Sequence, residues 1–163
     1  MSHIEESVEL TLGQKRGLVA RLLREKAGLK RGGSGLVHRL IEVQAARTPD
    51  SVAVTCSRGS LTYFELNARA NRLAGRLRGM GVGPEVLVGL CTGRSTAMVV
   101  GLLAVLKVGG AYVPIDPAYP PERIAFMLDD ACVSVLLTEQ RLLDDLPYGN
   151  TPVLCLDSEW ESI

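Results

Sequence analysis

Apolar residues along this chain follow two patterns, a helical period in longer segments and short continuous runs typical of buried strands. The helical segments lie at residues 36–47, 62–78, 96–108, 122–130 and 140–146. The strand-like runs lie at residues 52–56, 86–91, 111–115, 133–137 and 153–156. Strands that are covered on both faces belong to mostly parallel sheets. Because such strands alternate here with helices, the sequence predicts a layered α/β fold.

The segment at 96–108 is apolar on every side, which predicts a fully buried helix. Ser95 is its expected N-cap, while Lys107 in the last turn and Gly109 just beyond it are typical of a helix end. A short strand is expected at 111–115. Prolines at 117, 120 and 121 then force a turn before the next helix, since each removes a backbone donor and keeps the preceding residue extended.

Thr62 and Glu65 have the spacing of a capping box, in which each side chain accepts a hydrogen bond from the backbone amide of the other. The sequence before them predicts a strand or the edge of a hairpin, because the alternating residues of 52–56 are followed by a turn at 57–60. The helix after the box carries its apolar residues on one face. These are Leu66, Ala70, Leu73 and Leu77.

The first 35 residues differ from the rest of the chain. Residues Thr11–Ala27 predict a separate amphipathic helix with a basic polar face, and the glycine-rich residues 28–35 predict a flexible linker. We therefore divide the chain into an N-terminal segment at 1–27, a linker at 28–35 and an α/β domain at 36–163. The helix either packs on its own domain or docks on a neighbouring protein, since periodicity cannot name its partner.

Composition excludes several classes of protein. The chain has 18 basic and 18 acidic residues and a formal net charge of zero, so neither nucleic acid nor an acidic membrane is an expected partner. No apolar run has the length of a membrane span, and the start of the chain is unlike a secretory signal, so we expect a cytoplasmic location. Its scattered cysteines are expected to be reduced core residues. They are Cys56, Cys91, Cys132 and Cys155.

Candidate chemistry is sparse. His3 and His38 stand apart from any catalytic partner, and the glycine-rich stretch at 79–84 follows a helix and precedes a strand, the reverse of a dinucleotide loop. Residues 28–35 are not a phosphate loop, because no Gly-Lys-Ser or Gly-Lys-Thr follows them and no strand precedes them. Asp116 and Arg123 are one candidate ion pair across the proline-rich turn. We therefore predict no catalytic, cofactor-binding or metal-ligating residue in this chain.

Two motifs nevertheless resemble the core motifs of the adenylation domains of non-ribosomal peptide synthetases. The first motif comprises Leu61, Thr62, Tyr63, Glu65 and Leu66. The second comprises Leu106, Lys107, Gly109, Ala111, Tyr112, Pro114, Asp116 and Pro117, followed by Tyr119, Pro120 and Arg123. Val108 stands where the family has alanine. The motifs occur in the family's order, and the resemblance runs from about Leu36 to Leu156.

This resemblance implies the N-terminal portion of the adenylate-forming, acyl-CoA synthetase-like fold. The complete domain would use ATP and magnesium to form an aminoacyl-AMP, and would load the aminoacyl group on the phosphopantetheine of a carrier domain. The family's phosphate loop, specificity residues, adenine and ribose contacts and C-terminal lysine lie downstream of the matched region, so we expect this chain to bind no cofactor alone. The expected partners are the rest of the synthetase, its carrier domain and an upstream protein of the assembly line that binds the N-terminal helix.

Two alternatives remain. The chain is part of an acyl-CoA or aryl-acid ligase, or it is a non-catalytic interaction module in which the α/β domain is a scaffold. The peptide synthetases are favoured over the other ligases by the sequence of residues 112–117, which is followed by Tyr119 and Pro120.

Overall fold

The computed structural model describes residues 36–57, 59–160 and 163, and Val37–Ile163 forms one compact unit. The predicted helix Thr11–Ala27 and the predicted linker 28–35 lie outside the described residues. None of the helices in the described part of the chain is long and apolar enough to cross a membrane.

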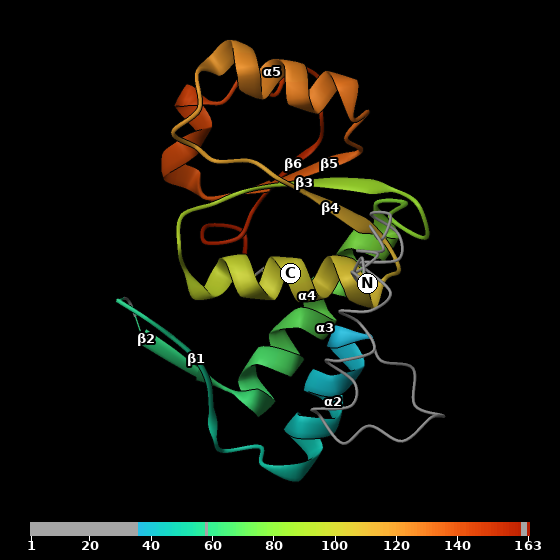
Figure 1. Ribbon diagram of the computed structural model, residues 1–163, viewed down its shortest axis with the longest axis vertical. Coiled ribbons are helices and arrows are strands. Elements are labelled where there is room, and N and C mark those ends of the chain that lie inside the picture. The colour runs from blue at the N-terminus through green and yellow to red at the C-terminus, as the bar shows by residue number, and fades with distance from the viewer. Residues whose placement is uncertain (1–35, 58, 161–162) are drawn as a thin grey trace, which may run out of the picture. The chain divides into compact units, whose positions relative to one another are not determined.

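A four-stranded parallel sheet forms the centre of this unit (Figure 1). Its strands are β3 (Leu87–Cys91), β4 (Ala111–Pro114), β5 (Val135–Thr138) and β6 (Val153–Cys155). They lie in the order β4-β3-β5-β6, so that the chain leaves β3, forms the edge strand β4 and returns to pair β5 with the other side of β3. The predicted layered α/β fold is confirmed.

Helices cover both faces of the sheet (Figure 1). Helix α5 (Pro121–Asp130) lies on one face, and α4 (Thr96–Lys107) lies on the other. Helix α3 (Tyr63–Gly79) packs against α4 from the far side, and α2 (Val37–Arg47) contacts both α3 and α4. The predicted helix at 140–146 is a 3₁₀ helix, Gln140–Asp145.

A small antiparallel hairpin precedes α3. It consists of β1 (Val52–Cys56) and β2 (Gly59–Thr62), with Cys56 opposite Gly59 at the turn. The predicted strand at 52–56 is confirmed, and of the two alternatives it forms one side of a hairpin. The second strand leads directly into α3 because Thr62 is both its last residue and the N-cap of the helix.

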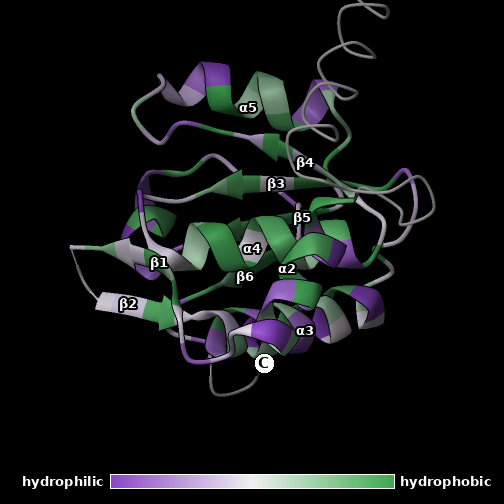
Figure 2. Cartoon of the chain, turned by 60° about the horizontal axis from the view of Figure 1, so that its bottom comes forward, coloured by the Kyte–Doolittle hydropathy of each residue, from purple (hydrophilic) through white to green (hydrophobic). Residues whose placement is uncertain are grey.

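Two apolar cores lie on opposite faces of the sheet. One core joins the apolar face of α3 to α4 and the sheet, and it contains Leu73 and Leu77, both fully buried. The other joins α5 to the sheet through Ile124 and Leu128. Helix α4 is apolar along most of its length (Figure 2), because it lies between α3 and the sheet.

Two details of the sequence prediction are wrong. Helix α4 is not buried on every side, because α3 and the sheet leave Met98 and Leu102 half-buried. Cys132 is not a core residue, since it lies exposed in the turn after α5 with a φ of 46°. The structure also shows that several apolar residues of α2 are exposed. They are Val37, Leu40 and Val43.

Candidate functional site

The sheet has a switch point between β3 and β5, where successive connections leave toward opposite edges. In open parallel sheets, ligands bind beyond the carboxyl ends of the strands at such a point. The segments that reach this place are residues 92–95 after β3 and Glu139 directly after β5. A binding or catalytic site is therefore expected at this edge of the sheet.

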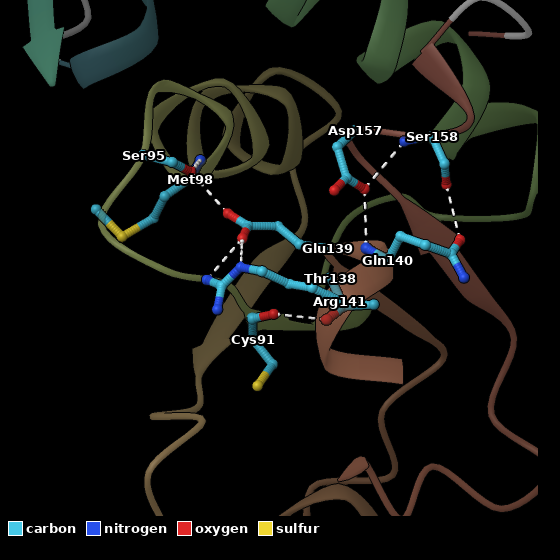
Figure 3. Close-up of polar contacts among 9 residues, drawn as sticks. All are labelled: Cys91, Ser95, Met98, Thr138, Glu139, Gln140, Arg141, Asp157 and Ser158. Carbon is cyan, nitrogen blue, oxygen red and sulfur yellow. Dashed lines mark hydrogen bonds and ion pairs between the residues drawn. The ribbon is translucent and has the colours of Figure 1, made fainter. Parts of the chain in front are cut away.

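Glu139 is the centre of a polar cluster at this edge (Figure 3). Its side chain is only 3% exposed, and its Oε2 lies 2.8 Å from both Nε and Nη2 of Arg141. Its Oε1 accepts a hydrogen bond of 3.0 Å from the hydroxyl of Ser95. Ser95 in turn accepts a bond of 3.4 Å from the amide of Met98, which confirms its role as the N-cap of α4. The carboxylate therefore links β5 to the start of α4, where the helix dipole favours negative charge.

The ends of β3 and β5 are joined by a second buried contact. The hydroxyl of Thr138 donates a bond of 2.8 Å to the carbonyl oxygen of Cys91 (Figure 3). Burial, together with the nearby charges of Asp116 and Glu139, raises the pKa of the Cys91 thiol to about 11. The thiol is therefore protonated at neutral pH and is a poor nucleophile there.

Gly93 leaves the space that Arg141 needs. A Cβ at this position would lie 2.5 Å from Nη2 of Arg141, well inside van der Waals contact. The Arg141 side chain, which reaches Glu139, thus occupies the space that a larger residue at position 93 would need.

A neighbouring cluster fixes the loop after β6. Asp157 Oδ1 accepts bonds of 2.9 Å from the amides of Gln140 and Ser158, and the hydroxyl of Ser158 donates to the side-chain oxygen of Gln140 (Figure 3). The amide of Cys155 donates to a carboxylate oxygen of Glu159 at 2.8 Å. Burial raises the pKa of the Cys155 thiol above its ordinary value. These contacts hold the loop in place.

The arrangement is suited to holding loops rather than to chemistry. Both oxygens of Glu139 are occupied by donors from the protein, so its carboxylate is not placed to remove a proton from a substrate. Among the described residues, no three His, Cys, Asp or Glu side chains are grouped to hold a metal ion. The loop between α3 and β3 follows a helix and precedes a strand, whereas a pyrophosphate-binding loop follows a strand and precedes a helix. Neither the Glu139 carboxylate nor the loop between α3 and β3 is therefore placed to hold a metal ion or a pyrophosphate group.

A groove lies beside the polar cluster, at the carboxyl ends of β3 and β4, with a volume of about 450 Å³. We call it the β4 groove. Its lining is mostly apolar and includes Met98, Leu102, Tyr112, Pro114, Tyr119 and Thr92. Thr92 is 8% exposed, and its buried hydroxyl oxygen has no hydrogen-bond partner among the described residues.

The first sequence motif lies at the junction of β2 and α3, away from this groove. The amide of Thr62 donates a bond of 2.8 Å to Oε2 of Glu65, and the amide of Glu65 donates one of 3.2 Å to the hydroxyl of Thr62. The bond from the Thr62 amide holds the pKa of Glu65 below its ordinary value. Leu61 and Leu66 are buried in the core, while Tyr63 is half-buried. The capping-box prediction is confirmed.

The second motif runs from the end of α4 through β4 to the start of α5. Leu106 and Lys107 form the last turn of α4, and Gly109 follows with a φ of 83°, a conformation that glycine adopts without strain. Ala111, Tyr112 and Pro114 belong to β4. Pro120 directly precedes α5, whose first residue is Pro121.

The predicted ion pair between Asp116 and Arg123 is absent. Asp116 Oδ1 instead accepts a bond of 2.9 Å from the amide of Ala118, which closes the turn around Pro117. The guanidinium of Arg123 lies over the ring of Tyr119, 4.2 Å from its centroid. The prediction is wrong because each group has a partner within the turn itself.

Sequence reasoning missed two ion pairs. One joins Glu139 to Arg141, and the other joins the ammonium of Lys107 to Glu42 on α2. The hydrogen bond from Lys107 holds the pKa of Glu42 below its ordinary value. A charged residue directly after a buried strand is the signal that would have identified Glu139. No pattern along the sequence pointed to Glu42, since it lies 65 positions from Lys107.

The fold defines a class, the α/β proteins with an open parallel sheet and a switch point, and comparison with known proteins defines the family. A model of the family described as AMP-binding enzyme matches residues 41–162. The chain therefore belongs to the AMP-binding enzyme family.

Within this family, the chain corresponds to part of a non-ribosomal peptide synthetase adenylation domain. It is 49% identical over 150 residues to tyrocidine synthase 3 of Brevibacillus parabrevis, a match that covers 92% of this chain and 2% of that protein. It is 50% identical over 127 residues to one of the linear gramicidin synthase proteins of the same organism, covering 78% of this chain and 2% of that protein. The chain thus spans only about 2% of the length of these relatives.

Solved structures agree with this assignment. The non-ribosomal peptide synthetase FmoA3 in its α-methyl-L-serine-AMP-bound form is 39% identical with a TM-score of 0.74, over 78% of this chain and 14% of that chain. The N-terminal subdomain of Klebsiella oxytoca NpsA is 25% identical with a TM-score of 0.68, over 77% of this chain and 32% of that chain.

Proposed function

We propose that this chain supplies the first part of the N-terminal subdomain of an amino-acid-activating adenylation domain. In the complete domain, ATP and magnesium convert an amino acid to its aminoacyl-AMP with release of pyrophosphate. The aminoacyl group then passes to the phosphopantetheine thiol of a carrier domain. The observation that carries this proposal is the identity of about half with peptide synthetases across most of the chain.

The contribution of these residues is structural. The Glu139 cluster joins the ends of β3 and β5 to the start of α4, and the capping box sets the start of α3. Neither leaves a charged group available to a triphosphate. The chemistry that the family performs needs a backbone loop, a metal and a cation around the phosphates, and we propose that these come from the remainder of the domain.

An aryl-acid ligase is the second candidate. Its support is the fold shared with the N-terminal subdomain of NpsA, whose complex with 3-hydroxybenzoyl-AMSN is 25% identical to this chain. The peptide synthetases are more similar, at 39% for FmoA3 and 49–52% for the linear gramicidin and tyrocidine synthases. We therefore favour an amino acid over an aryl acid as the substrate of the complete domain.

The proposed partners follow from the multidomain relatives. They are the rest of the adenylation domain and a carrier domain, together with an upstream protein of the assembly line that binds Thr11–Ala27. We propose that the protein works in the cytoplasm, where amino acids and ATP are available. The domain limits of 1–27, 28–35 and 36–163 are part of the same proposal.

The test is the DNA immediately downstream of the codon for Ile163. An in-frame phosphate loop rich in glycine, serine, threonine and lysine, followed by the remaining adenylation motifs, supports the proposal. A stop codon at that point in the native gene contradicts it and favours a non-catalytic interaction module.

A further inference from the structure

Two helices on opposite sides of the sheet carry opposite charge, although the whole chain is neutral. Helix α3 contains four arginines and one acidic residue, whereas α5 contains three acidic residues and one arginine. Figure 1 shows α3 beyond α4 on one side of the sheet and α5 on the other side. The outer sides of these two helices are therefore candidate contact surfaces of complementary charge.

The outer side of α3 carries a stripe of arginines. Arg69, Arg72 and Arg76 are all exposed, and their spacing of three and four residues makes them neighbours along one side of the helix. Arg69 lies over the ring of Trp160, 5.6 Å from its centroid. Arg72 and Arg76 have neither an ion pair nor a side-chain hydrogen bond with another described residue. We call the three arginines the arginine face.

The outer side of α5 carries two carboxylates with an aromatic ring between them. Glu122, Phe126 and Asp129 are exposed, and their spacing of four and three residues again makes them neighbours along one side of the helix. Phe126 is 66% exposed, the highest value among the large apolar side chains of the described residues. The two carboxylates have no ion-pair or hydrogen-bond partner among those residues. We call these three side chains the acidic face.

The two faces match in register when the helices run antiparallel. The spacing along α3 is three and then four residues, and along α5 it is four and then three. Seven residues separate the ends of each face, a distance of about 10.5 Å along the helix axis. Two ion pairs then flank a guanidinium that stacks on an aromatic ring. The opposed side chains are Arg69 with Asp129, Arg72 with Phe126 and Arg76 with Glu122.

We propose that copies of this chain associate through these faces, with the arginine face of one copy packed against the acidic face of the next. Because the faces lie on opposite sides of the sheet (Figure 1), one pair of copies cannot form both contacts at once. Each copy binds one neighbour through α3 and another through α5, so the contact is heterologous and forms open chains. Exposed ion pairs each contribute little, so the association is weak and is screened by salt. It is independent of the proposed adenylation activity.

Charge favours a second copy over other anionic partners. A nucleic acid or an acidic membrane brings many negative charges close to residues 36–163, which contain 14 acidic and 11 basic residues. The acidic face brings only two carboxylates, both opposite an arginine, and it adds a ring opposite Arg72. A short acidic helix is therefore the better match for the arginine face, and α5 is such a helix.

Two charge-reversed variants of the 163-residue chain test the contact. One carries Arg72→Glu with Arg76→Glu and reverses the arginine face. The other carries Glu122→Lys with Asp129→Lys and reverses the acidic face. All four side chains are exposed, and circular dichroism verifies that each variant is folded. Where a reversed variant does not fold, the neutral substitutions Arg72→Gln with Arg76→Gln, or Glu122→Gln with Asp129→Asn, take its place.

The matched control carries Arg47→Glu with Arg94→Glu. These arginines are exposed and lie outside both faces, so the control changes the net charge as much as reversal of the arginine face does. Sedimentation velocity measures association from micromolar to millimolar protein, at about 50 mM and about 500 mM salt, which differ in screening length. The native chain and the control are expected to sediment faster as their concentration rises at low salt, without levelling at the value of a dimer.

Each reversed variant alone is expected to associate at least about tenfold more weakly than the native chain, because two attractive contacts become repulsive. An equimolar mixture of the two variants is expected to regain association. The intact acidic face of one variant then meets the intact arginine face of the other, and the two reversed faces are also of opposite charge. Loss of surface charge without a specific contact does not produce this recovery.

A native chain that stays monomeric at low salt overturns the inference, and so does a mixture of the two variants that fails to associate. Equal loss of association in the control assigns the effect to net charge, and a plateau at the dimer contradicts the heterologous geometry. If reversal of the arginine face alone leaves association intact, another basic group binds α5 and the inference is wrong. Binding of a poly(dT) oligonucleotide that the arginine-face variant loses, without self-association of the native chain, assigns that face to nucleic acid and also overturns the inference.

Discussion

Removal of the Arg141 guanidinium tests whether the Glu139 cluster holds the fold together. The Glu139 side chain is 3% exposed, and Arg141 is its only cationic partner among the described residues. Breaking a buried ion pair by removal of one partner costs about 3–5 kcal/mol, because it leaves an uncompensated buried charge. Since the Arg141 side chain is 51% exposed, we expect Arg141→Ala to lower the free energy of unfolding by about 3 kcal/mol, the lower end of that range.

The assay is urea unfolding of the 163-residue chain, followed by circular dichroism and by the fluorescence of its single tryptophan, Trp160. Trp160 is a suitable reporter because it packs against α3, with the guanidinium of Arg69 5.6 Å from its ring centroid. Arg72→Ala, which removes an exposed arginine from α3, is the control for loss of positive charge. We expect that control to change stability by less than about 0.5 kcal/mol.

A double-mutant cycle with Glu139→Gln gives the sharper result. Glutamine retains the oxygen that accepts from Ser95 but carries no charge. Added to Arg141→Ala, it removes the unpaired carboxylate, so the double variant is expected to be more stable than Arg141→Ala alone. The reasoning is refuted if Arg141→Ala behaves like the Arg72 control, or if Glu139→Gln destabilises the Arg141→Ala protein further.

Three other predictions concern the capping box, the sheet and the buried thiol. Thr62→Ala is expected to lower the free energy of unfolding by about 1 kcal/mol, because the helix cap is lost. Thr55→Ala is the control and is expected to show no comparable loss in the same urea unfolding experiment. Gly89→Ala is expected to destabilise by about 1–3 kcal/mol, since its Cβ would lie 2.9 Å from Leu136, while Gly75→Ala on the open face of α3 is expected to stabilise; equal melting temperatures would count against this packing. Because burial raises the folded pKa of Cys91 from 9.0 to about 11, its contribution to stability is complete below pH 9 and is lost as the pH rises toward 11. The difference in unfolding free energy between the native chain and Cys91→Ala should therefore shrink across that window, and a constant difference would show that Cys91 does not titrate as described.

Local signals in the sequence predicted the elements well. The capping box, the Ser95 cap, the hairpin turn and the glycine at 109 each depend on residues within four positions of one another, so periodicity and turn chemistry were sufficient. The alternation of apolar strands and helices then predicted the parallel sheet. The strand order, with β3 between β4 and β5, is a property of the long-range pairing and was not available from that alternation.

The candidate site was harder to predict because its contacts are long-range. Ser95 and Glu139 are 44 positions apart, and their bond depends on two strands ending at the same edge of the sheet. The predicted ion pair of Asp116 and Arg123 was wrong because of local contacts. Asp116 accepts a hydrogen bond from the amide of Ala118, and Arg123 lies over the ring of Tyr119. Burial of α4 was overestimated because the sequence shows how apolar a helix is but not how many sides are covered.

Amino-acid-dependent exchange of labelled pyrophosphate into ATP tests the central claim most directly. It is measured with the purified 163-residue chain across all common amino acids, and in parallel with an extended protein that carries the remainder of the adenylation domain. The account predicts no exchange above a no-enzyme control for the chain alone and clear exchange with at least one amino acid for the extended protein. Exchange by the chain alone would contradict the proposal that these residues form the scaffold of the domain rather than its catalytic centre.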